Sequence, residues 1–64
     1  MTEKELAYVE DATMHEQSII KICTETLNNL QDDNLKNFIQ EEISKHEEIE
    51  SSLINLLEVH ANEW

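Results

Sequence analysis

The sequence contains no glycine and no proline in its 64 residues. Glycine supplies the positive φ angles of tight turns and proline fixes many bends, so folds that depend on turns seldom form without them. Long α-helices need neither residue. Thr2 is followed three residues later by Glu5, which is the pattern of a capping box. A helix is therefore expected to begin at residue 2 or 3.

Apolar residues recur at spacings of three and four along two segments, which is the period of one helical face. The Asn- and Asp-rich stretch over residues 28–34 separates the segments, and Asp32 or Asp33 is a good N-cap for a second helix. We predict one all-α domain over residues 1–64, with helices over about 2–30 and 34–62 and a turn over about 31–33. On a 100° helical wheel, the second apolar stripe centres on Leu35 and Leu53. The first stripe contains Leu6, Val9, Ala12, Ile19, Ile20, Cys23, Leu27 and Leu30, and the second contains Leu35, Phe38, Ile39, Ile49, Leu53, Leu56 and Leu57.

Because the turn is short, the two helices are expected to lie antiparallel as a hairpin. A chain of this length buries only about 60% of its unfolded surface, so a partner or a metal has to add stability. The single cysteine, Cys23, excludes an internal disulfide and is expected to be a small core residue. Pairing of two hairpins into a four-helix bundle would cover the remaining apolar surface, and we expect a homodimer. Tyr8 and Ile22 fall off the main stripe and are expected to be scattered surface residues, with packing at the bundle flank or a weak second contact surface as the alternative.

The formal net charge of −11 repels phosphate groups, so nucleic acid and anionic membrane surfaces are not expected as partners. No apolar run approaches the roughly 20 residues of a membrane span, and no signal peptide is evident. A free cysteine fits a reducing compartment, which predicts a cytoplasmic protein.

Four ionisable residues interrupt the apolar stripes: Glu16 in the first helix and Glu42, His46 and His60 in the second. If the turn centres near residue 32, Glu16 and His46 lie at nearly the same height and face each other. Two interpretations stay open. Glu16 and His46 form a structural polar pair that fixes the pairing of the helices, or Glu16, His46 and Glu42 bind a divalent metal such as zinc, iron or manganese.

Three stretches resemble the Coat F domain of spore coat proteins, which belongs to the ferritin-like four-helix group. They are Asp11–Gln17, the turn Asp32–Leu35 with Phe38 shortly after it, and Leu53–Leu57, within a similarity that runs from about Asp11 to His60. The resemblance implies a helical hairpin that pairs into a ferritin-like bundle, with coat or other helical proteins as further partners and the spore coat as a location. It implies no reaction. Glu16 matches the first-helix glutamate of ferritin-like metal sites, but His46 and Ile49 stand where that group has its Glu-x-x-His pair.

No catalytic triad, phosphate-binding loop or CxxC pair occurs in the sequence. We therefore expect a small structural or assembly protein rather than an enzyme, with no cofactor. The alternative is a metal-binding bundle with a degenerate Glu/His site.

Overall fold

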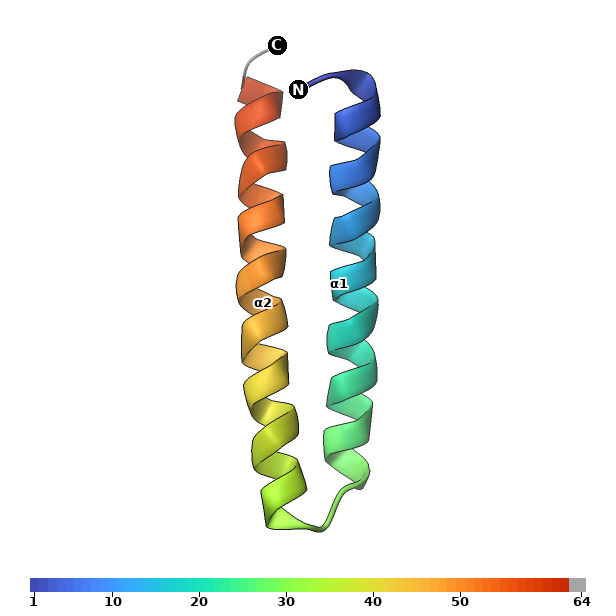
Figure 1. The fold of residues 1–64 in the computed structure, drawn as a ribbon, viewed down its shortest axis with the longest axis vertical. Helices are drawn as coiled ribbons and strands as arrows, with labels where there is room; N and C mark the ends of the chain where they lie inside the picture. The colour runs from blue at the N-terminus through green and yellow to red at the C-terminus, as the bar shows by residue number, and fades with distance from the viewer. Residues whose placement is uncertain (63–64) are drawn as a thin grey trace.

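The computed structural model describes residues 1–62 and contains two antiparallel helices, α1 (Glu3–Asn29) and α2 (Asp33–Asn62) (Figure 1). The hairpin is long and thin, measuring 48 × 14 × 12 Å. Both predicted helices are confirmed, and each observed boundary lies within one residue of the predicted one.

The caps explain why the chain turns without glycine. The Thr2 hydroxyl accepts a hydrogen bond from the Glu5 amide at 3.1 Å, and the Thr2 amide donates to Glu5 Oε1 at 2.8 Å, which confirms the capping box. Hydrogen bonding to the Glu5 carboxyl, first from the Thr2 amide and then from the Thr2 side chain, holds its pKa below the usual value. At the second helix, Asp32 Oδ1 accepts from the Leu35 amide at 2.9 Å. Leu30 is extended, and no described residue has a positive φ, so the connection needs no glycine.

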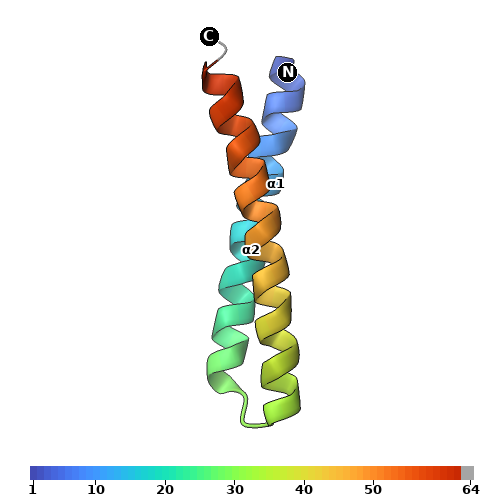
Figure 2. The same cartoon turned by 90° about the vertical axis from the view of Figure 1, so that its left-hand side faces the viewer.

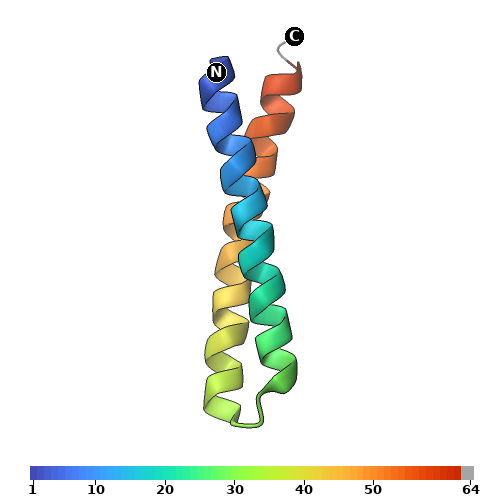
Figure 3. The same ribbon diagram turned by 90° about the vertical axis from the view of Figure 1, so that its right-hand side faces the viewer.

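All but two of the buried and partly buried residues, the exceptions being Ile19 and Glu42, repeat at alternating spacings of three and four along both helices, and we call this repeating set the hairpin seam. A 3.5-residue repeat is the period of a coiled coil, in which the helices cross at a small angle. Figures 2 and 3 show the two helices crossing in this way. The hairpin seam consists of Leu6, Val9, Thr13, Glu16, Ile20, Cys23, Leu27 and Leu30 on α1 and Lys36, Ile39, Ile43, His46, Glu50, Leu53, Leu57 and His60 on α2.

Several predicted stripe residues are not in the hairpin seam. Leu35 and Phe38 expose 52% and 57% of their surface, and Ile49 and Leu56 expose 45% and 48%. The 100° wheel superposes Leu35 on Leu53, but a 3.5-residue repeat drifts by about 20° per heptad and separates them by about 50°. The assignment of Leu35 to the stripe centre was therefore wrong.

The interior of the hairpin is thin. Among residues 1–62 no hydrophobic residue is buried, and the two buried residues, Thr13 and His60, are polar, with 7% and 9% of their surface exposed. The Thr13 hydroxyl donates to the Val9 carbonyl of its own helix at 2.7 Å, so this buried group needs no partner from α2. Two helices alone leave the other seam residues only partly covered.

Candidate association surface and polar seam layer

The exposed hydrophobic residues are not scattered. Most of them occupy the position immediately before a seam residue, on both helices, which gives them the same heptad repeat as the seam. Tyr8 and Ile22, expected to be isolated, are members of this set, with 63% and 61% of their surface exposed. We call the set the apolar face; it contains Tyr8, Ala12, Ile19 and Ile22 on α1 and Leu35, Phe38, Ile49, Leu56 and Val59 on α2.

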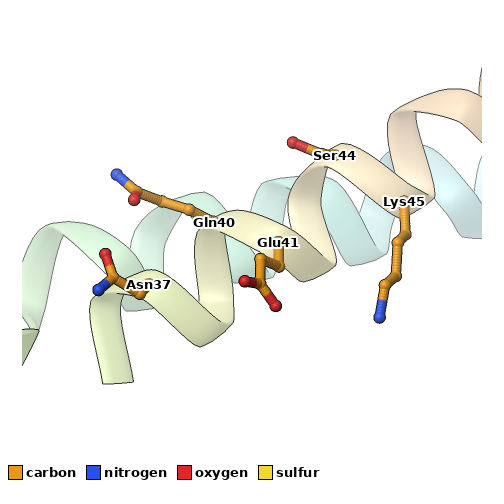
Figure 4. A pocket seen from close by; sticks show the side chains of 5 residues that line it. All are labelled: Asn37, Gln40, Glu41, Ser44 and Lys45. Carbon is orange, nitrogen blue, oxygen red and sulfur yellow. The ribbon is translucent and has the colours of Figure 1, made fainter. Parts of the chain in front are cut away.

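Symmetry places these residues on one side of the hairpin. An antiparallel helix pair has an approximate two-fold axis perpendicular to the plane that contains both helices, and this axis exchanges equivalent heptad positions without exchanging the two faces. Residues that precede a seam position therefore lie on one face, and residues that follow one lie on the other. Figure 4 shows the division on α2, where Gln40 and Ser44, which follow seam residues, point to one side and Lys45, which precedes one, points to the other.

The opposite face is polar. Its positions on α2 begin with Asn37, Gln40, Ser44 and Glu47, and Met14 and Ile54 are its two large hydrophobic residues. Shallow depressions lined by Asn37, Gln40, Glu41, Ser44 and Lys45 run along the outer side of α2 (Figure 4). They are surface grooves between polar side chains, and they lack the enclosed apolar lining of a small-molecule site.

The total exposed surface is larger than expected for the mass. The hairpin exposes 5004 Å². A compact folded protein of this mass exposes about 4,200 Å², so the excess is roughly 750 Å². A stable protein–protein interface of standard size covers about 800 Å² on each partner. The excess is therefore close to what one partner chain would cover.

Two charged residues divide the apolar face on α2. Glu42 and Lys45 lie between Phe38 and Ile49, and Lys45 Nζ donates to Glu42 Oε1 at 3.4 Å. The Glu42 side chain is 30% exposed and the Lys45 side chain 66% exposed. An exposed pair at this spacing contributes little to helix stability, about 0.3–0.5 kcal/mol.

The predicted contact between Glu16 and His46 is present. His46 Nδ1 and Glu16 Oε2 are 2.5 Å apart, and their side chains are 24% and 16% exposed. A proton must lie between two atoms at this distance, and we assign it to Nδ1, so that the imidazole donates to the carboxylate. The contact fixes the alignment of the helices, because it puts residue 16 level with residue 46.

Two further seam residues make the middle of the hairpin polar. Thr13 lies one turn from Glu16, and Glu50 lies one turn from His46 on the other helix. Apolar seam residues flank this layer on both sides, with Leu6 and Val9 toward the termini. The 100° helical wheel did not identify Thr13 and Glu50 as stripe residues. Counting in alternating steps of three and four residues, forward from Leu6 on α1 and backward from His60 on α2, reaches both.

The three residues predicted to bind a metal are only partly brought together. Glu16 and His46 are in contact, whereas Glu42 lies one turn away on α2 and bonds to Lys45. Within the described residues no group of three or more His, Cys, Asp or Glu side chains is close enough to hold an ion. One hairpin therefore offers two metal ligands, and a complete site would need donors from elsewhere. His60, the fourth polar stripe residue, is buried at the end near the termini.

Two other residues with titratable side chains lie apart from this contact. His15 is on the surface, where its Nε2 is 3.4 Å from Asp11 Oδ1 and both side chains are about 70% exposed. Cys23 is a free thiol in the hairpin seam. In the described part of the chain, neither helix is apolar enough over sufficient length to cross a membrane. No family model, curated protein or solved structure matches this chain.

Proposed function

We propose that the chain is a self-association module with a structural role, in which two hairpins pack their apolar faces together as a four-helix bundle. The observation that carries the proposal is the apolar face itself. Large side chains lie on one side of both helices, and seven of them expose between 45% and 63% of their surface. Large exposed hydrophobic side chains gathered on one face are typical of an interface.

The interior of a single hairpin supports the same conclusion. With no buried hydrophobic residue within residues 1–62, the hairpin lacks the core that gives small domains their stability. A second layer of helices would cover the apolar face and the open flank of the seam together. A copy of the same chain is the simplest occupant, because identical patches can be self-complementary across a two-fold axis.

In this proposal the polar seam layer, which consists of Thr13, Glu16, His46 and Glu50, sets the alignment of the two helices. A hydrogen bond to a charged group contributes about 1.5–3 kcal/mol when its partner is present, and leaving such a group unpaired costs at least as much. Sliding one helix by a single turn would separate Glu16 from His46. In one direction Glu16 would meet the like charge of Glu50, and in the other it would meet Ile43. The pair therefore selects one alignment of the hairpin, and with it one arrangement of the apolar face.

Thermal unfolding at several protein concentrations tests the proposal. Only the folded dimer benefits from association, so the melting temperature should rise as the concentration increases from micromolar to hundreds of micromolar. A melting temperature that does not change across this range would rule out self-association as the source of stability. A melting temperature that rises only on addition of another helical protein would assign the face to that partner instead.

Metal binding is the second candidate function, and the Glu16–His46 contact is the observation that favours it. A carboxylate and an imidazole meet in the seam at 2.5 Å, and both are ligands for zinc, iron and manganese. Elemental analysis of the purified protein tests it first, followed by thermal melts with and without each metal. A bound metal must raise the melting temperature, and Glu16→Gln must abolish that rise.

A further inference from the structure

We infer, resting on the proposed self-association, that the two hairpins of the dimer point in opposite directions, with their connecting loops at opposite ends of the bundle. In this arrangement α2 packs antiparallel on α2 of the second copy, and α1 packs on α1. The two-fold axis passes between Glu42 and Lys45. The alternative dimer has both loops at the same end, with α2 packed on α1 of the second copy.

The order of residues along α2 carries the inference. Across a two-fold axis each residue meets the one at the same distance on the other side. Inversion of the α2 stripe about the midpoint of Glu42 and Lys45 places Phe38 against Ile49 of the second copy. It also places Glu42 against Lys45, and Lys45 against Glu42. On α2 the two apolar residues nearest the axis, Phe38 and Ile49, then meet each other, and both charges meet their opposites, whereas Leu35 meets Ser52.

The same axis also crosses α1, where it would place Ile22 against His15 of the second copy. The Glu16–His46 contact aligns the two helices, so the midpoint of Glu42 and Lys45 on α2 is level with Ile19 on α1. Ile19 would therefore lie at the axis and pack against its own copy. It is half-buried already and belongs to the apolar face, so a symmetric contact between two isoleucines adds apolar burial without adding charge.

The alternative dimer is unfavourable if each hairpin keeps the helix alignment that the Glu16–His46 contact sets. With both loops at one end, Glu42 and Lys45 would lie at the height of Ile19 on the α1 helix of the second copy. Two charged side chains would then face an isoleucine, with no opposite charge across the interface. Covering this ion pair with an apolar side chain removes water from both charges and adds no polar contact across the interface, which is costly, and such mismatches are a common means of excluding a wrong arrangement.

A charge-exchange experiment tests the facing of α2 on α2. Glu42→Lys and Lys45→Glu each place like charges across the axis, so each variant alone should dimerise roughly tenfold or more weakly than the native chain. An equimolar mixture should recover tight association, because the heterodimer pairs opposite charges. Each variant also loses the bond between Glu42 and Lys45 within its own helix, but mixing does not restore that bond.

The matched controls are Lys21→Glu and Glu47→Lys, which make the same changes of net charge on the polar face. These two should dimerise like the native chain, alone and mixed. Two results would overturn the proposed orientation. One is that mixing Glu42→Lys with Lys45→Glu does not recover tight association, and the other is that mixing strengthens the control pair equally.

Distances between spin labels decide the orientation directly. A label at Gln31→Cys in the loop, in a Cys23→Ala chain, lies about twelve residues from the axis, so the two labels should be roughly 35–40 Å apart. A label at Glu3→Cys, near the termini, should give roughly 45–50 Å. With loops at the same end, both distances would fall below about 20 Å, and this result would overturn the inference while leaving the dimer intact. Sedimentation of the same labelled samples as monomers would instead contradict the proposed function.

Discussion

Phe38 offers the sharpest test of the apolar face, through the substitution Phe38→Ala. In the single hairpin this side chain is 57% exposed. Aromatic side chains bury roughly 150–250 Å², so about 110 Å² of Phe38 remains to be covered by a second copy. At about 25 cal/mol per Å² this area is worth close to 3 kcal/mol, of which alanine retains about a third.

Both copies carry the change, so the dimer should lose about 4 kcal/mol, which is roughly a thousandfold in the dissociation constant. Met14→Ala is the matched control. Met14 is 63% exposed in the single hairpin but lies on the polar face. Sedimentation equilibrium should show a shift toward monomer for Phe38→Ala and a dissociation constant within a few-fold of native for Met14→Ala. Equal effects of the two substitutions would refute the assignment of the apolar face.

Three further predictions concern charge and the polar seam layer. Because two chains of charge −11 repel each other, dimerisation should tighten as the salt concentration rises from 50 to 500 mM. Over this range the Debye length falls from about 14 to about 4 Å, so the repulsion is screened. Weaker association at high salt, measured by sedimentation, would contradict this prediction. His46→Leu leaves the Glu16 carboxylate partly buried without its hydrogen-bond donor, and it should lower the free energy of unfolding in urea by about 1–3 kcal/mol. Adding Glu16→Leu should restore or exceed the native stability. An additive loss in the double variant would show that the pair itself is the source of stability. If the pair is structural, zinc, manganese and iron should leave the melting temperature unchanged, and a rise of several degrees that disappears in Glu16→Gln would favour the metal-binding alternative.

Local signals in the sequence were sufficient for the helices and their ends. The capping box at Thr2 and the cap at Asp32 act through hydrogen bonds within three residues, so they can be identified without knowledge of the fold. The contact between Glu16 and His46 was also predictable. It depends only on the position of the turn and on the constant rise per residue along two antiparallel helices.

The face that each apolar residue occupies was harder to predict. Leu35 and Phe38 were assigned to the same stripe as Leu53 because an ideal straight helix repeats every 3.6 residues, whereas two helices that cross and coil keep contact every 3.5 residues. The error grows along a helix, and the structure corrects it by placing these residues outside the hairpin seam, on the same face as Tyr8 and Ile22. Hydrophobicity alone did not distinguish residues that join α1 to α2 from residues that are available to a second chain.

Sedimentation equilibrium of the native chain, with circular dichroism on the same samples, tests the central claim most directly. The apolar face predicts a helical species of about 15 kDa, twice the 7.5 kDa of one chain, at tens of micromolar. On dilution this species should dissociate and lose helix together, because a single hairpin has no buried hydrophobic residue within residues 1–62 to keep it folded. A fully helical monomer of 7.5 kDa at these concentrations would contradict the account.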